Sequence, residues 1–160
     1  MIYSFNDISD SFHSCQYLGD WYTQQVIFAS YVLPTDTCSR AQYGSFDNGT
    51  VSVYNIGSTI EGTFDEACGW ASQADPEGPP GELEVNFGGF GGPYWVLDTD
   101  YESFASVYSC SDGPIGAVKN ENAFILTREI FPSDETVSQL SSYLFASHIT
   151  QISFPVGEGI

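Results

Sequence analysis

The strongest constraint on the fold is a series of short segments in which apolar and polar residues alternate. In one of them Leu83, Val85 and Phe87 alternate with polar neighbours, as in a strand with one wet face and one apolar face. Turn signals rich in Gly, Pro, Asn and Asp separate the segments. The predicted strands are residues 20–28, 38–46, 50–57, 59–67, 82–88, 93–99, 103–110 and 122–129.

This pattern predicts an all-β protein, an eight-stranded up-and-down antiparallel β-barrel, because closure removes the exposed edges of such a sheet. Residues 69–81 are expected to form a long loop. One α-helix is predicted after the last strand, with Ser133 as its N-cap and Leu140 on its apolar stripe, packed outside the barrel and ending near residue 147 or 148. The length of 160 residues predicts a single domain over residues 1–160.

The charge of the chain excludes several partners. The sequence has 21 acidic residues against three basic ones, a formal net charge of −18. Binding to nucleic acid or to an anionic membrane depends on Lys and Arg, so we expect neither partner. The sequence has no run of 18 apolar residues, the length that a membrane-spanning helix needs.

Motifs for catalysis or metal binding are absent from the sequence. His13 and His148 are the only histidines, and neither belongs to a hydrolase or zinc motif. The many carboxylates make chance pairs inevitable, and none has the spacing of an EF-hand. We therefore predict no catalytic residue, no metal site and no enzyme activity.

Cysteines and one triplet favour an extracellular setting. Four Cys without C-x-x-C spacing favour two disulfides over a zinc site. Asn48-Gly49-Thr50 is an acceptor triplet for N-glycosylation, and Asn-Gly is also the commonest hairpin turn. The turn alone would explain the triplet, so glycosylation of Asn48 is one of two interpretations.

One basic residue is predicted on an apolar face. Alternation in residues 122–128 places Arg128 on the same face as Phe124 and Leu126. A charge in such a place needs an aromatic face and backbone carbonyls as partners.

Three motifs, in order, resemble those of the lipocalin family. Gly19 and Trp21 form the G-x-W that opens the first lipocalin strand, the turn 99–101 is similar to the family's T-D-Y turn, and Arg128 is similar to the arginine after its eighth strand. The resemblance covers roughly residues 12–154. It is greatest to the branch that contains apolipoprotein D, insect bilin-binding proteins and crustacyanin-type carotenoid proteins.

The resemblance implies roles for these residues. Trp21 would plug the closed end of the barrel, Arg128 would stack on its indole, and the turn of Thr99, Asp100 and Tyr101 would brace the same floor. Alternation from these inward residues, together with an inward aromatic of the branch at Tyr43, predicts a ligand cavity that begins near Thr23. Its predicted lining is Gln25, Ala41, Tyr43, Ile60, Phe64, Leu83, Val85, Phe87, Trp95, Leu97, Phe124 and Leu126.

The resemblance implies a carrier that binds, and transports or sequesters, a hydrophobic small molecule. No cofactor is expected beyond that ligand. A carotenoid or other pigment is favoured, because Arg40 is expected to point outward and Lys119 to lie in a loop, which leaves little to bind an anion. A bilin, fatty acid or steroid is the alternative. A lipocalin-type isomerase, which uses a Cys inside the barrel, and self-association into homo- or hetero-oligomers are further alternatives.

The disulfide pattern departs from that branch, whose N-terminal and C-terminal partner cysteines this chain lacks. The strand directions of the lipocalin barrel would place Cys15 and Cys68 near the closed end, and Cys38 and Cys110 near the open end. We therefore predict the bridges Cys15–Cys68 and Cys38–Cys110, since a disulfide needs Cα atoms within roughly 7 Å.

Overall fold

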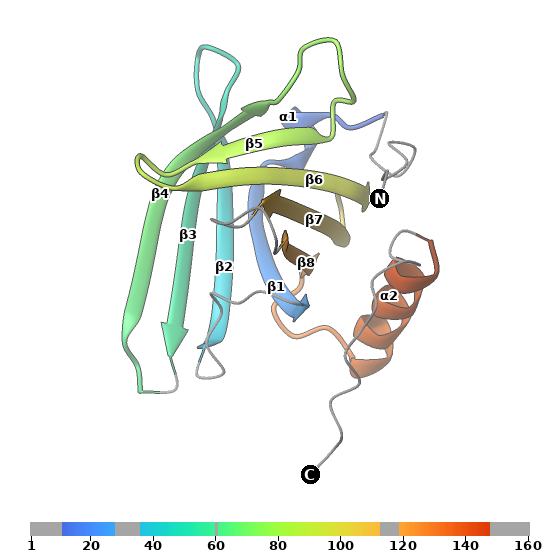
Figure 1. The fold of residues 1–160 in the computed structure, drawn as a ribbon. Coiled ribbons are helices and arrows are strands. Elements are labelled where there is room, and N and C mark those ends of the chain that lie inside the picture. Colours follow the sequence, from blue (N-terminus) through green and yellow to red (C-terminus); the bar gives the residue numbers. More distant parts are fainter. Residues whose placement is uncertain (1–10, 28–35, 60, 113–118, 148–160) are drawn as a thin grey trace.

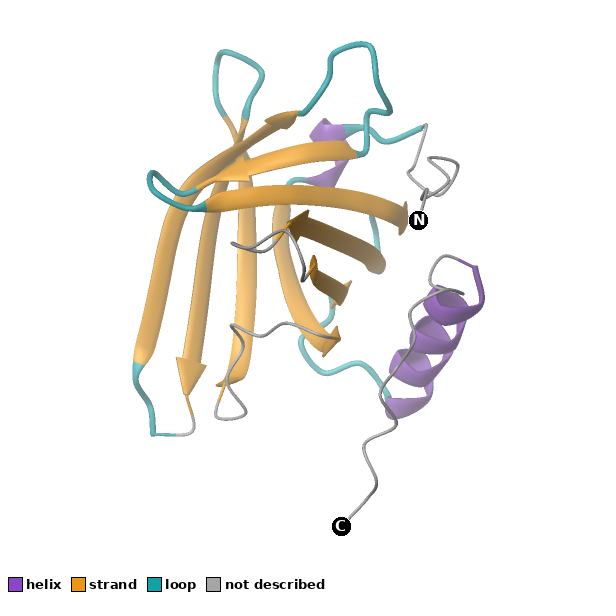
Figure 2. Ribbon diagram, viewed as in Figure 1, coloured by secondary structure: helices purple, strands orange, loops and turns teal. Residues whose placement is uncertain are grey.

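The chain forms a closed antiparallel barrel of eight strands in sequence order, with β8 pairing back to β1 (Figures 1 and 2). The computed structural model describes residues 11–27, 36–59, 61–112 and 119–147. The predicted fold class is confirmed. The elements are α1 (Ser14–Tyr17), β1 (Gly19–Ile27), β2 (Asp36–Ser45), β3 (Val51–Thr59), β4 (Phe64–Gln73), β5 (Glu82–Asn86), β6 (Gly91–Thr99), β7 (Phe104–Asp112), β8 (Lys119–Thr127) and α2 (Asp134–Ser147).

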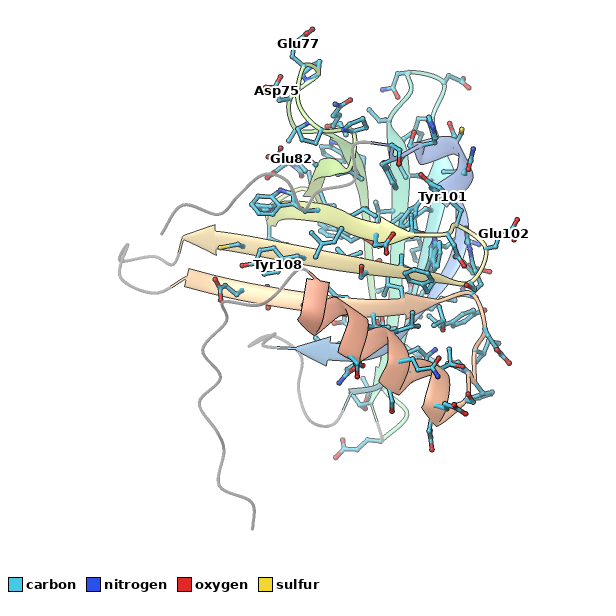
Figure 3. The ribbon with its side chains drawn as sticks, turned by 90° about the vertical axis from the view of Figure 1, so that its right-hand side faces the viewer. Asp75, Glu77, Glu82, Tyr101, Glu102 and Tyr108 are labelled. Atoms are coloured by element: carbon cyan, nitrogen blue, oxygen red, sulfur yellow. The ribbon has the colours of Figure 1, made fainter. Side chains whose placement is uncertain are left out.

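Two apolar clusters hold the fold together. The larger cluster fills the barrel around Trp21, with α1 and Phe12 closing one end. The smaller lies on the outer face and joins Tyr108 and Ile125 to Leu140 of α2. Figure 3 shows α2 crossing this outer side, with Tyr108 nearby. The helix therefore packs outside the barrel, as predicted.

The predicted start of α2 is confirmed in detail. The Ser133 hydroxyl accepts the backbone N–H of Thr136 at 3.1 Å, which satisfies one of the free donors of the first turn. Asp134 and Glu135 lie in that turn, where they favour the helix dipole.

Several predicted strand boundaries were wrong, most clearly at β4 and β8. β4 continues to Gln73, into the first part of the expected loop 69–81, because Ala71 pairs with Val51 on one side and Val85 on the other. Its inner face consists of small residues, so the sequence shows no apolar alternation there. β8 begins at Lys119, opposite Asp112, rather than after a loop that contains this lysine.

Candidate functional site

The inner face of the barrel is identified by the side chains that pack around Trp21. This indole is 0% exposed, and its cross-strand partner is Ala41, while Gly19 pairs with Tyr43. Paired residues of neighbouring strands share a face of the sheet. The predicted inward orientation is confirmed for Ala41, Tyr43, Leu83, Val85, Phe87, Phe124 and Leu126.

Trp95 and Leu97 lie outside the barrel, contrary to prediction. Both belong to the outer cluster, and the neighbouring Val96 is buried inside. The prediction counted back from Asp98 as an outward residue. The pairing of β6 with β7 shifts between Val96 and Asp98, and this irregularity leaves Leu97 and Asp98 both outside. Because of this one extra residue in β6, the side chains before Asp98 face the opposite side of the sheet from the one predicted.

Gln25 points outward for the same reason. The pairing of β1 with β8 shifts between Thr23 and Gln25, so Thr23 pairs with inward Leu126 while Gln25 pairs with outward Ile125. The Gln25 side chain accepts a hydrogen bond from the hydroxyl of Ser141 on α2. It therefore anchors the helix instead of lining the cavity.

Phe64 was also wrongly placed. Its side chain is 73% exposed, and its partner across β3–β4 is Ser58 on the outer face. The prediction assigned the turn between these strands too early in the chain, so the alternation began on the wrong residue. Ile60 lies outside the described residues.

The predicted floor of the barrel is present. The Arg128 guanidinium lies 3.8 Å from the centroid of the Trp21 ring. It donates to the carbonyl oxygens of Asp20 at 2.8 Å and Tyr101 at 3.1 Å, and the Trp21 indole N–H donates to the carbonyl of Tyr17 at 2.8 Å. Arg128 thus has the aromatic face and the carbonyls that its position requires.

The turn between β6 and β7 braces this floor. Asp100 Oδ1 accepts the backbone N–H groups of Glu102, Ser103 and Phe104 at 3.1, 2.8 and 3.0 Å. Partial burial alone would raise the pKa of Asp100, but these bonds and one from the Ser103 hydroxyl hold it below the ordinary value. Thr99 Oγ1 accepts the N–H of Tyr101, which adopts a left-handed φ of 65° beside α1 (Figure 3).

Three tyrosines meet just above the floor, and the prediction included only Tyr43. The Tyr94 hydroxyl lies 2.9 Å from the hydroxyl of Tyr17 and accepts a hydrogen bond from Tyr43, also at 2.9 Å. The ring of Tyr17 stacks on Trp21 with centroids 5.0 Å apart. Burial raises the pKa of Tyr43 to about 12 and also raises the pKa values of Tyr17 and Tyr94 well above the ordinary value. We call Tyr17, Tyr43 and Tyr94 the tyrosine triad.

The triad retains a hydrogen-bond donor. Its three hydroxyls carry three protons, and two hydrogen bonds join them. Tyr43 donates to Tyr94, so the remaining donor is Tyr94 or Tyr17, depending on which of them donates to the other. The inner end of the barrel can therefore offer one phenolic O–H to an acceptor oxygen.

Space is small at the floor. The hollow beside the triad measures about 10 Å³, room for a single water molecule. Further from the floor, the inner face of β2–β4 carries small or polar residues. Ala41, Asn55 and Ala67 form one cross-strand row, and Ser39, Gly57 and Asp65 form the next. These side chains are short, and all six residues are partly or largely exposed.

A second hollow, of about 260 Å³, lies at the closed end. His13 and Cys15 border it on one side, Gln73 and Pro80 of the β4–β5 segment on the other. No predicted cavity residue apart from Leu83 lines it.

The predicted disulfides are absent from the described residues. Cys15, Cys68 and Cys110 are free, so each predicted bridge lacks at least one partner. Cys68 alternates with Ala67 and is exposed on the outer face of β4, whereas α1 packs into the end of the barrel. Cys110 packs in the outer cluster. The side chain of Cys38 lies outside the described part of the structure.

Asn48 lies at the exposed tip of the hairpin between β2 and β3. Its side-chain oxygen accepts the backbone N–H of Thr50 at 3.1 Å and the Thr50 hydroxyl at 2.7 Å, and Gly49 has a φ of 83°. The turn interpretation is confirmed, and glycosylation stays a prediction.

Charges and metal ligands are sparse inside the barrel. Arg128 belongs to the floor, Asp65 lies on the inner face of β4 away from the floor, and Arg40 pairs with outward Tyr22. The acidic Asp75, Glu77 and Glu102 lie on loops and turns (Figure 3). Among the described residues no group of three or more His, Cys, Asp or Glu could hold a metal ion. No described helix has the length and apolar character to cross a membrane.

Comparison with known proteins identifies similar chains. The family model described as a lipocalin-like domain matches residues 13–147. Apolipoprotein D of Bos taurus is 35% identical over 146 residues, which cover 89% of this chain and 74% of that protein. The Crustacyanin-A1 subunit of Homarus gammarus is 29% identical over 124 residues, 77% of this chain and 66% of that protein.

The solved structure of lobster apocrustacyanin A1 has a similar barrel. It superposes with a TM-score of 0.67 at 26% identity and covers 87% of this chain and 73% of its own.

Proposed function

The chain belongs to the lipocalin family, and we propose that it binds a hydrophobic small molecule inside its barrel and carries or sequesters it. The observation that carries this proposal is the part of the inner face nearest the floor, which is apolar around a single unused phenolic donor. Because the floor is filled, the ligand lies above the triad, along the small residues of β2–β4. Its inner end bears an oxygen that accepts the phenolic proton.

Charge favours a neutral ligand. The sequence holds three basic residues, of which Arg128 is bound in the floor and Arg40 lies on the outer face. A carboxylate taken into the barrel would lose its hydration without a cationic partner. An oxygenated carotenoid or related isoprenoid therefore suits the site better than a bilin, fatty acid or other anion. The resemblance to pigment-binding lipocalins favours the same class.

An isomerase activity is the alternative function, and the cysteines argue against it. Such a mechanism needs a thiol inside the barrel, facing the ligand. Cys15 and Cys68 are exposed, and Cys110 packs on the outer face. None of these described thiols faces the proposed ligand space above the triad, and Cys15 borders only the separate hollow at the closed end.

Retinol and retinoate test the ligand class, because they share an isoprenoid skeleton and differ in charge. We expect retinol to quench tryptophan fluorescence saturably and retinoate to bind at least about tenfold more weakly, a difference of about 1.4 kcal/mol. The A67F variant, which fills the proposed space, should weaken retinol binding by a similar factor, with A67L as a milder second variant. S138F on the exposed side of α2 is the matched control.

Equal retinol affinity in A67F and S138F would contradict a ligand inside the barrel. Tighter binding of retinoate would contradict only the preference for a neutral ligand.

For the pigment itself, protein purified from its native source should show a visible absorption band. Native mass spectrometry of the same material would give the ligand mass.

A further inference from the structure

Neither described helix packs on the outer face of β2, β3 and β4. α2 packs beside β8 on the other side of the barrel (Figures 1 and 2). Trp70 is 44% exposed on this uncovered face, alongside the exposed Phe64 and the partly exposed Tyr54 and Ile56. We call it the β2–β4 face.

The register of the three strands arranges the β2–β4 face in cross-strand rows. One row is Arg40, Ile56 and Glu66. The row toward the β2–β3 hairpin, two places along, is Gly44, Ser52 and Trp70. In both rows the central residue lies on β3. The residue on β4 is acidic or bulky, and the residue on β2 is basic or has no side chain.

Such rows are self-complementary under a two-fold axis. If two β2–β4 faces meet across an axis parallel to β3, the rotation places β4 of one copy over β2 of the other. Arg40 then faces Glu66 of the second copy, and Trp70 covers the space left by Gly44. Ile56 meets its own equivalent at the centre. A closed dimer requires this kind of self-complementary surface.

The distribution of charge also favours the β2–β4 face as the place where two copies meet. Each chain carries a formal charge of −18, so most contacts between two copies would be repulsive. Arg40 lies on this face, while Arg128 is bound in the floor. Glu66 is exposed, and its carboxylate accepts a hydrogen bond from Tyr54, which raises the pKa of Tyr54. The face thus presents one cation and one oriented carboxylate, two strands apart.

We propose that the β2–β4 face is a homodimer interface, in which two copies of this chain pair Arg40 with Glu66 reciprocally around Ile56 and seat Trp70 over Gly44. Three strands at ~4.8 Å spacing and six residues at ~3.4 Å give a footprint of roughly 15 by 20 Å per copy. That is about 300 Å² per copy, less than half of the roughly 800 Å² per partner of a standard interface, so the dimer is weak and transient and forms in the micromolar range or above.

Charge reversal distinguishes this dimer from unspecific association. Sedimentation velocity of the full chain at 0.15 M salt should show a dimer that increases with concentration. Both R40E and E66R should be monomeric, because each places like charges opposite one another. E66R lowers the net negative charge, so general charge relief alone would increase its association. An equimolar mixture of R40E with E66R should form a heterodimer, since every facing pair is again of opposite sign.

A second pair of variants tests the apolar contact. W70A should weaken the dimer at least about tenfold, and F131A, at an exposed site between β8 and α2, should leave it unchanged. Circular dichroism checks that each variant is folded. A monomer at all concentrations, a dimer unaffected by R40E and E66R, or failure of the mixture to form heterodimers would overturn the proposal. None of these readouts involves the barrel ligand, so its outcome is independent of the proposed function.

Discussion

Replacing Trp21 with alanine should lower the free energy of unfolding by about 3–5 kcal/mol. The indole is fully buried, it stacks on Tyr17, and its N–H is bonded to the Tyr17 carbonyl. The substitution also removes the aromatic face under Arg128, whose charge would then adjoin a cavity. Urea unfolding followed by far-UV circular dichroism measures the loss.

Trp70 provides the matched control for this experiment. W70A deletes the same atoms from a side chain that is 44% exposed, so we expect a loss of about 1 kcal/mol or less. If W21A does not fold at all, W21F still tests the argument, because it keeps an aromatic face for Arg128 and should have an intermediate stability. Equal losses in W21A and W70A would show that the floor does not hold the barrel closed.

The sequence predicted the barrel and its floor because both depend on local signals. Turn residues mark the ends of most strands, and the positions of Gly19, Trp21 and Arg128 follow from motifs that can be read directly. The cross-strand register is not local. A single irregularity between Val96 and Asp98 reversed the predicted orientation of Trp95 and Leu97, and nothing in the residues themselves marks it.

The tyrosine triad was missed for a related reason. Tyr94 lies next to Trp95, so the error that placed Trp95 inside also placed Tyr94 outside. Tyr17 precedes the first strand, on the short helix α1, where strand alternation carries no information. The pairing of Tyr94 with Leu83 would have identified it, since Leu83 was correctly predicted to face inward.

The triad also predicts unfolding in alkali. All three hydroxyls are neutral below pH 10 in the folded and unfolded chain, so their contribution to stability is complete there. Above pH 10 the unfolded chain loses these protons, while burial keeps Tyr43 protonated to about pH 12 and also raises the pKa values of Tyr17 and Tyr94 well above the ordinary value. The folded state therefore loses up to about 1.4 kcal/mol per tyrosine for each pH unit between pH 10 and 12.

For Tyr43 alone the loss by pH 12 is about 2–3 kcal/mol, a large part of the stability of a typical domain, and the raised pKa values of Tyr17 and Tyr94 add to it. We therefore expect cooperative unfolding between pH 10 and 12, with tyrosinate absorbance near 295 nm appearing together with the loss of far-UV circular dichroism. Y43F removes one of the three protons and should move this transition to higher pH, although the lost hydrogen bond costs about 1 kcal/mol at neutral pH. Full tyrosinate absorbance in a chain that keeps its circular dichroism would show that the triad is not buried in the native barrel.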